Sequence, residues 1–368
     1  MHSITFHCRT ISPLFLSGPD TDLPELRPPS IKGALRFWTR AICLGWPWDN
    51  GTANHKMLLS RDEALFGGVT TGVQRSMVSV SIRHNSFQTV TGPSLNLQAG
   101  GKYLWYSLIV DGYQQQRRGI AANEPFAVTL QSRDETALRQ AVAAFWVLTF
   151  LGSLGTRARR GAGSFEVVHT EGMPLPEGLN FSMNADAKQF LASGLKSARR
   201  IFEVNPTTVR SNDYSTLGRL WVSNGVESWE KAVDHIGQTM LTHRKATPNR
   251  DRAKRTFTMT TLNQKAAFGL PVSVYEDNSV NFNGQDNDKY SRRASPVCIS
   301  LIKHLGETYW IVSELKGKFT PDGIHIEFHS KNPRATCSLD YDWEDADNRL
   351  LTSFFQKLTT DGHAIDFK

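Results

Sequence analysis

Apolar and polar residues alternate at the start of the chain. Ile4, Phe6 and Cys8 fall on one side of residues 2–9, and polar or charged residues fall on the other. A period of two residues is typical of a strand with one buried face. Similar patterns predict three further strands in the first half, at residues 76–83, 102–110 and 164–169.

Two long stretches carry apolar residues at helical spacing. The first stretch begins at Ser30, a good N-cap, and ends at Gly45. The second opens with the capping-box pattern of residues 132–135 and runs to Gly152. With the strands, these helices give the order β-α-β-β-α-β, which is typical of a ferredoxin-like domain. We therefore predict one such domain over residues 1–172, with helices on one face of its sheet and the other face free.

The second half mixes helices and strands, so the fold class is α+β. Residues 170–180 combine Pro and Gly and are the best candidate for a linker. We expect a second domain over residues 173–368, whose topology between 173 and 260 the pattern does not define. The elements expected in it are helices at 185–202, 228–241 and 348–358, a hairpin of 296–302 with 308–315, a strand at 323–329, and an exposed basic loop at 243–255.

Composition excludes several classes of protein. The chain has 368 residues, of which 39% are hydrophobic and 21% charged, as in an ordinary globular protein of two domains. The longest apolar run, residues 141–151, is too short to span a bilayer. The four cysteines have no paired spacing, so neither a disulfide framework nor a zinc ribbon is expected. We expect free thiols in a reducing cytoplasm, and no cofactor.

The charge is basic and unevenly distributed. The net charge is +7, and residues 1–172 carry 17 Lys and Arg against 12 Asp and Glu, an excess of +5. Such an excess suits an anionic partner without identifying one.

The first predicted helix carries a basic stripe. Lys32, Arg36 and Arg40 are four residues apart and share one face, beside an apolar stripe that includes Trp38. Trp38 is therefore expected in the core. The basic stripe is either a solvated helix face or a surface that contacts phosphates.

A second basic motif follows the second helix, in the stretch FLGSLGTRARRGAGSF at residues 150–165. Its glycines allow tight turns with exposed backbone N–H groups, and its arginines add charge. It is not a nucleotide-binding P-loop, because it follows a helix, opens a strand and lacks the Lys-Ser/Thr pair. The alternative is an ordinary turn with solubilising arginines. The residues concerned are Gly152, Gly155, Gly161 and Gly163, with Arg157, Arg159 and Arg160.

Recognisable catalytic motifs are absent from the sequence. It contains no H-E-x-x-H, C-x-x-C or G-x-S-x-G pattern, so neither a metal centre nor a hydrolase elbow is indicated. Asp20 and Asp22 fit a turn better than a general base, and His7 and His84 fit surface positions. The acidic run at 340–347 fits a solvated turn. We therefore expect a protein that is not an enzyme.

Several motifs taken together resemble a known family. PLFLSG, LRPPSIKGALRFWTRAI, DEALFGG and GSLGTRARRGAGS follow one another in the first half, and FGLPVSV and SRRASPV in the second. In this combination the chain resembles the RAMP superfamily of CRISPR-associated proteins. More narrowly, it is similar to the first-numbered subunits of Cmr (type III-B) effector complexes. It departs from their pattern at Thr39, where a second aromatic residue is common.

The resemblance implies a fold and a function. It implies two ferredoxin-like, RRM-related domains with insertions, in a non-catalytic subunit that contacts the 3′ part of the CRISPR guide RNA and assists target RNA capture in antiviral defence. The implied partners are guide RNA, target RNA and other RAMP subunits of the complex. The implied RNA-binding residues are the basic stripe, the arginines of the glycine-rich stretch, and Arg292 and Arg293.

The sequence is also compatible with two other functions. Some RAMP relatives are endoribonucleases that process guide precursors, and such an enzyme needs a general base, usually His, near the ribose. The other function is that of a small-nucleotide-binding enzyme, a hypothesis that only the glycine-rich stretch supports.

Overall fold

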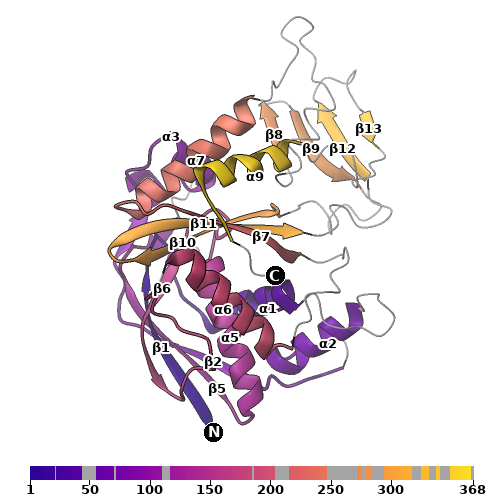
Figure 1. Cartoon of the computed structure of the whole chain (residues 1–368). Coiled ribbons are helices and arrows are strands. Elements are labelled where there is room, and N and C mark those ends of the chain that lie inside the picture. The colour runs from indigo at the N-terminus through magenta and orange to yellow at the C-terminus, as the bar shows by residue number, and fades with distance from the viewer. Residues whose placement is uncertain are drawn as a thin grey trace, which may run out of the picture.

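The computed structural model gives a mixed α and β chain built on antiparallel sheets (Figure 1). It describes residues 1–20, 22–43, 55–69, 72–109, 117–184, 186–203, 215–246, 268, 272–275, 278–283, 294–316, 325–330, 337–339 and 349–365.

The first sheet has four antiparallel strands in the order β2-β5-β1-β6. Its strands are β1 (His2–Thr10), β2 (Val78–Arg83), β5 (Pro125–Ser132) and β6 (Phe165–Gly172). Helix α1 (Pro28–Cys43) lies between β1 and β2 in the chain, and α5 (Glu135–Leu151) between β5 and β6. The order β-α-β-β-α-β is the one predicted from the sequence.

The prediction of a strand at residues 102–110 is wrong. These residues form the helices α3 (Ala99–Leu104) and α4 (Tyr106–Ile109), and β5 supplies the third strand of the sheet. The aromatic and β-branched residues of 102–110 suggest a strand, but tertiary contacts decide otherwise. Asp234 accepts hydrogen bonds from the N–H groups of Gln98 (2.9 Å) and Gly101 (2.7 Å) and so stabilises the start of α3.

The predicted ends of the two long helices also need correction. Helix α1 begins at Pro28, two residues before Ser30, because proline fits the first helical turn. Its expected end at Gly45 lies outside the described residues. The N-cap of α5 is Asp134, whose side chain accepts from the N–H of Ala137 at 2.8 Å. Ser132 instead accepts from the N–H of Asp134.

The second sheet repeats the order of the first. Its antiparallel strands lie in the order β10-β11-β7-β14, and helices α7 and α9 fall between them in the chain so that the element order is again β-α-β-β-α-β. The elements are β7 (Thr216–Ser223), α7 (Trp229–Ala246), β10 (Val297–His304), β11 (Glu307–Lys316), α9 (Arg349–Asp361) and β14 (Gly362–Ile365). The predicted hairpin is β10 and β11.

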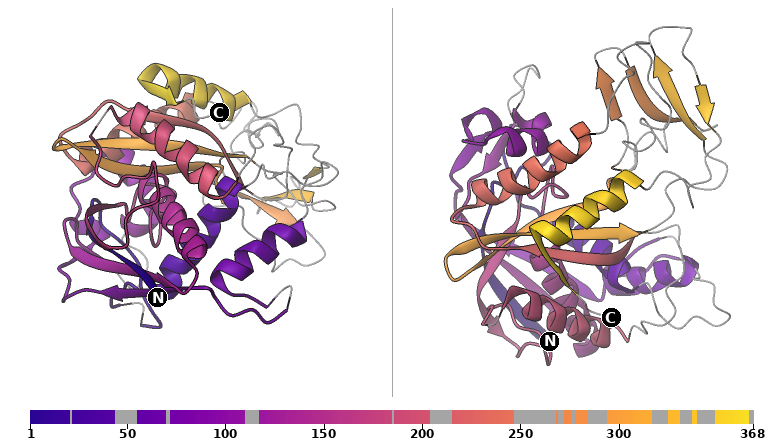
Figure 2. Two further views of the ribbon diagram at one scale, coloured as in Figure 1. Left: turned by 60° about the horizontal axis from the view of Figure 1, so that its bottom comes forward. Right: turned by 45° about the horizontal axis from the view of Figure 1, so that its top comes forward.

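Both faces of the second sheet are buried, each against different helices (Figure 2). Cys298 and Ile302 of β10 join the core that contains α1, α5 and the first sheet, whereas Ile299 and Leu301 join the core that contains α7 and α9. The layers are therefore sheet, helices, sheet, helices. In the middle, α5 is buried at every residue from 141 to 151, which explains the longest apolar run of the chain.

The remaining described elements surround these layers. Leu179 and Phe181 pack into the core that contains α5, so the segment expected as a linker is anchored to the protein. Residues 243–246, expected at the start of an exposed basic loop, instead form the last turn of α7. No described helix is long and apolar enough to cross a membrane. Besides α3 and α4, the described elements that belong to neither of the first two sheets nor to their helices are α2 (His55–Phe66), α6 (Ala187–Ile201), β3 (Thr89–Thr91), the 3-10 helix η2 (Gly92–Ser94), β4 (Arg118–Ile120), and a third sheet of β8 (Val272–Tyr275), β9 (Asn278–Asn283), β12 (His325–Ser330) and β13 (Cys337–Leu339).

Candidate nucleic-acid interface

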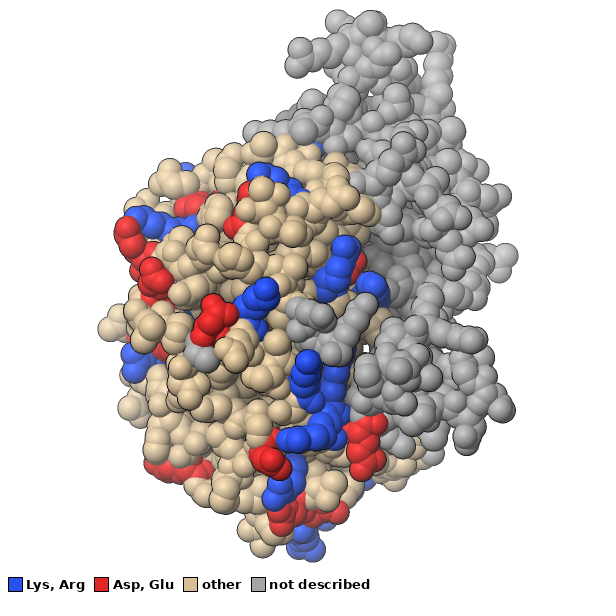
Figure 3. Space-filling model, in the orientation of Figure 1, with Lys and Arg blue, Asp and Glu red and all other residues tan. Residues whose placement is uncertain are grey.

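Basic side chains gather in a band on one face of the molecule, over the region where Figure 1 places α1 and α6 (Figure 3). Helix α1 buries Ile31, Leu35, Trp38 and Ile42, which leaves the neighbouring face to the basic stripe. The sequence therefore predicts correctly that Trp38 lies in the core.

Lys32 donates from Nζ to Ser76 Oγ at 3.0 Å. Burial, and then the charge of Arg36, lower the pKa of Lys32.

The two arginines of the stripe share one buried carboxylate. Asp62 of α2, only 1% exposed, accepts from Arg36 NH2 and Arg40 NH1, each at 2.8 Å. Arg36 also donates to the Gly67 carbonyl at 3.0 Å. The spacing of four residues places both arginines within reach of a single carboxylate. One of their two charges is thus balanced, so the stripe is less cationic than the sequence suggests.

Asp62 belongs to this site but to no recognised binding motif, although it begins the stretch DEALFGG. The signal available in the sequence was an acidic residue within a stretch that accompanies the basic helix. A buried carboxylate requires cationic partners such as Arg36 and Arg40, because an unpaired charge is costly to bury.

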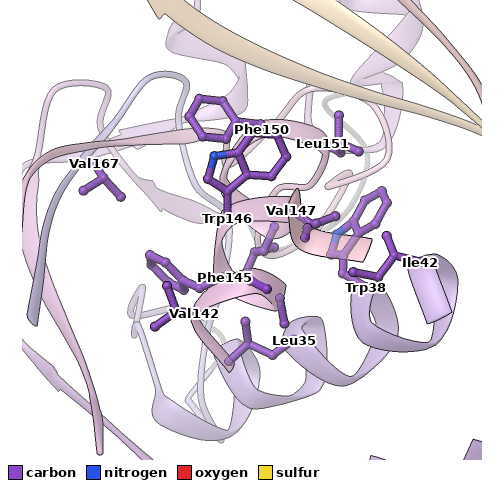
Figure 4. Packing of buried hydrophobic residues seen from close by; sticks show 14 of the residues in the cluster. Leu35, Trp38, Ile42, Val142, Phe145, Trp146, Val147, Phe150, Leu151 and Val167 are labelled. Carbon is purple, nitrogen blue, oxygen red and sulfur yellow. The ribbon is translucent and has the colours of Figure 1, made fainter. Parts of the chain in front are cut away.

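Gly152 follows α5, where a glycine in the left-handed conformation commonly ends a helix. It does not adopt a left-handed conformation at the end of α5: its φ is −111° and ψ is −176°, which is extended. Its missing side chain is explained by Trp38, since a Cβ at position 152 would lie 2.3 Å from Trp38 Nε1. Figure 4 shows Trp38 and Ile42 of α1 beside Val147 of α5, the contact that needs this close approach.

The other glycines of the stretch do adopt positive φ. Gly155, Gly161 and Gly163 have φ of 85°, 82° and 72°. At Gly163 a Cβ would lie 2.0 Å from the Leu154 carbonyl oxygen, so this turn needs glycine.

The backbone N–H groups of this turn are largely used within the protein. Thr156 N donates to the Phe15 carbonyl (2.7 Å), Gly161 N to that of Ile299 (3.0 Å) and Gly163 N to that of Pro13 (2.9 Å). The expectation of exposed N–H groups is therefore wrong for these positions. They do not form the phosphate cradle that a small-nucleotide site would require.

Instead, the stretch joins the first half of the chain to the edge strand β10. Arg160 and Ile299 form a parallel bridge, and the N–H of Ile299 donates to the Arg159 carbonyl at 3.1 Å. The side chains reinforce this junction: Arg159 donates to the Ser295 carbonyl (2.7 Å) and Arg160 to the Val297 carbonyl (3.0 Å). Burial lowers the pKa of Arg160 to about 10. Both arginines therefore link the turn to the backbone at the start of β10.

Arg157 differs from its two neighbours. Among the described residues the one hydrogen bond of its side chain runs from Nε to Ser107 Oγ at 2.9 Å. Burial lowers its pKa, and Tyr103 acts in the opposite direction. Arg157 and Arg159 each use one guanidinium nitrogen in the hydrogen bonds among the described residues, whereas Arg160 uses two, and of the first two only Arg157 bonds to a side-chain hydroxyl rather than to a backbone carbonyl.

One aromatic contact unites the helix and the turn. The Arg159 guanidinium lies over the Phe37 ring, 4.9 Å from its centroid. The basic helix and the glycine-rich turn, more than 100 residues apart in sequence, therefore form one contiguous surface.

Two histidines lie together elsewhere, on the free face of the first sheet. His7 Nε2 is 3.2 Å and His169 Nε2 is 3.8 Å from Glu171 Oε1, and the two rings are 5.6 Å apart. Sequence spacing could not show this pairing, which the register of β1 with β6 creates. No group of three metal-binding side chains occurs among the residues that the structure describes.

Other candidate residues lie outside the described part of the chain. These are Arg292 and Arg293 and the acidic run at 340–347.

Comparison with known proteins identifies relatives. Residues 7–166 match the RAMP superfamily. Two curated Pyrococcus furiosus proteins are similar: CRISPR system Cmr subunit Cmr1-1, 27% identical over 84% of this chain and 85% of its own, and Cmr1-2, 29% identical over 45% of this chain and 96% of its own.

Solved structures share the fold. The crystal structure of apo Cmr1 from Pyrococcus furiosus matches with a TM-score of 0.64 and 21% identity, over 99% of this chain and 98% of that one. A chain in the cryo-EM structure of type III-B Cmr-beta bound to cognate target RNA matches with a TM-score of 0.58 and 12% identity, over 97% and 99%. The resemblance to the RAMP superfamily and to first-numbered Cmr subunits is confirmed.

Proposed function

Since this chain carries a RAMP superfamily region and resembles Cmr1 proteins over most of its length, we propose that it is an RNA-binding, non-catalytic subunit of a type III-B CRISPR effector complex. Its partners are the guide RNA, the target RNA and other RAMP subunits. It contacts the 3′ part of the guide, assists target capture and works in the cytoplasm.

The repeated topology supports the fold that this proposal needs. Each of the two sheets has antiparallel strands and the element order β-α-β-β-α-β, so we interpret both as ferredoxin-like, RRM-related domains with insertions. The third sheet and α3 with α4 are insertions into that plan. The domains correspond to residues 1–172 and 173–368.

The observation that carries the proposal is the contiguous surface of α1 and the glycine-rich turn. Two basic stretches from distant parts of the sequence meet there through Phe37 and Arg159. Lys32 and Arg157 each make one hydrogen bond to a serine hydroxyl and none to a carboxylate among the described residues. Such donors suit phosphate oxygens.

Contacts of this kind position RNA without reading its sequence. In a guide complex the base pairing of guide with target carries the specificity. We assign phosphate contacts to Lys32 and Arg157, with Arg36 and Arg40 adding charge and remaining anchored on Asp62. Arg159 and Arg160 hold the turn in place, and we place the guide on this surface rather than the target.

Salt-dependent binding of single-stranded RNA by the full chain tests the proposal. The double variant Lys32→Gln/Arg157→Gln should bind more weakly and flatten the slope of log K against log salt by about 1 to 2 units, because up to two phosphate contacts are lost. Fluorescence anisotropy with an oligouridine at several salt concentrations measures both effects.

Arg139→Gln is the matched control. It removes one positive charge from an exposed ion pair with Glu135 at the start of α5, about 20 Å along the helix from the turn. Its slope should equal that of the wild type. An unchanged slope in the double variant would remove the assignment of this surface.

The His7–His169 pair supports a second candidate function, an endoribonuclease that processes guide precursors. Two imidazoles 5.6 Å apart beside a carboxylate are suited to acid-base chemistry on a ribose. This candidate predicts metal-independent cleavage of repeat RNA at one position by the purified chain, lost in both His7→Gln and His169→Gln. Equal yields of product from wild type and both variants would exclude it.

A further inference from the structure

The elbow between α3 and α4 is fixed to the glycine-rich turn on both sides of Tyr106. Trp105, fully buried, donates from Nε1 to the Arg160 carbonyl at 2.8 Å. Ser107 accepts from Arg157 Nε at 2.9 Å. Both chain neighbours of Tyr106 are therefore fixed to the glycine-rich turn, which holds the backbone of Tyr106 at this elbow.

Tyr106 nonetheless exposes its ring. Its side chain is 61% exposed, and it is the one aromatic residue among the large hydrophobic side chains that are exposed in the described ranges. The neighbouring Trp105 shows that an aromatic ring at this elbow can be fully buried. An exposed ring in a fixed position is a feature of binding surfaces.

The surroundings of Tyr106 are cationic. Arg117 donates to Thr156 Oγ1 at 3.4 Å, which places a second guanidinium beside the turn. Within the described residues no carboxylate forms an ion pair with Arg117 or Arg157. Asp234, an acidic residue that contacts the start of α3, has both carboxylate oxygens on backbone N–H groups, those of Gln98 and Gly101.

Arg157 also occupies a strained backbone position. Its φ is +63°, in the left-handed region that favours glycine, in a turn that uses glycine at three other positions of this kind. Backbone positions of this kind cluster at functional sites, which is consistent with a role for the Arg157 side chain.

We propose that Tyr106 stacks on a base of bound single-stranded RNA while Arg157 and Arg117 hold the adjoining phosphates. This inference rests on the proposed RNA-binding function and adds a base contact to a surface so far assigned to the backbone alone. An aromatic ring flanked by cations is the arrangement that binds single strands without sequence preference, since every base has a π-face. A base-paired strand would leave no free face for Tyr106.

Two RNA probes separate a base contact from a backbone contact. The full chain is titrated with a fluorescent oligouridine and with an abasic oligomer of the same length. Tyr106→Ala should weaken oligouridine binding by about 5- to 100-fold with an unchanged salt slope, and should leave abasic binding unaltered. Tyr106→Phe should restore wild-type affinity. Arg117→Gln/Arg157→Gln should flatten the salt slope for both probes.

Leu305→Ala is the control for loss of an exposed apolar side chain, since Leu305 is exposed in the turn between β10 and β11. It should bind both probes as the wild type does. Unchanged oligouridine affinity in Tyr106→Ala, or equal loss for both probes, would overturn the inference and leave the RNA-binding function standing. Wild-type chain that binds neither probe would overturn both. Unchanged RNA affinity with lost assembly onto the other subunits would assign Tyr106 to a protein neighbour.

Discussion

At the scale of single residues, the arginines of the glycine-rich stretch have different roles. Arg159 and Arg160 bond to backbone carbonyls at the start of β10, whereas Arg157 bonds to a serine hydroxyl. The sequence TRARR does not distinguish the three arginines, because the carbonyls that bind two of them lie at the start of β10, about 140 residues later in the chain. A variant that removes all three would therefore mix a folding defect with a binding defect.

Arg160→Met should lower the free energy of unfolding by about 2–4 kcal/mol, because two buried carbonyl oxygens lose a charged donor. Arg157→Met should cost about 1 kcal/mol or less, since one hydroxyl contact is lost. Urea denaturation of both variants measures the difference. Equal losses would contradict the division of roles.

The buried thiols should make stability depend on alkaline pH. Burial raises the pKa of Cys8 and of Cys298. The folded state then holds these protons when the unfolded state releases them near pH 8.5, so stability falls as pH rises above that value. Denaturation curves at pH 7.5 and 9.5 should show a smaller decrease for Cys8→Ala/Cys298→Ala than for wild type. Parallel decreases would contradict this account.

At the scale of elements, Gly163 and Gly33 differ in whether the backbone at their position requires glycine. Gly163→Ala should cost about 3 kcal/mol or more, because φ is +72° and the new Cβ meets a backbone oxygen. Gly33→Ala should stabilise by about 0.5–1 kcal/mol, since Gly33 is exposed in α1 with nothing within 4 Å of a Cβ. Thermal unfolding of both variants tests this. A Gly163→Ala variant as stable as wild type would contradict the turn geometry.

Elements with a strong internal pattern could be predicted from the sequence. The alternation of Ile4, Phe6 and Cys8 and the apolar run of residues 141–151 indicate side chains that the structure buries between the first sheet and α5. The helices at residues 102–109 could not be predicted, because their start is stabilised by Asp234, which lies more than 100 residues later in the chain. The basic stripe was found, but Asp62 was not, because its pairing with two arginines depends on how α2 packs on α1.

At the scale of the whole molecule, the two sheets share α5. The second sheet packs one face against the helices of the first, so neither half has a separate core. We expect a single unfolding transition, with a calorimetric enthalpy equal to the van't Hoff enthalpy. Arg160→Met should shift that whole transition. Two resolved transitions would contradict a shared core.

We propose that RNA lies on the surface formed by α1, the glycine-rich turn and the α3–α4 elbow. Photocrosslinking of the full chain to a 4-thiouridine-substituted single strand, followed by peptide mass spectrometry, maps the contact directly. We expect crosslinked peptides within residues 28–43, 104–109 and 150–165. Crosslinks confined to the free face of the first sheet, around His7 and His169, would contradict the claim.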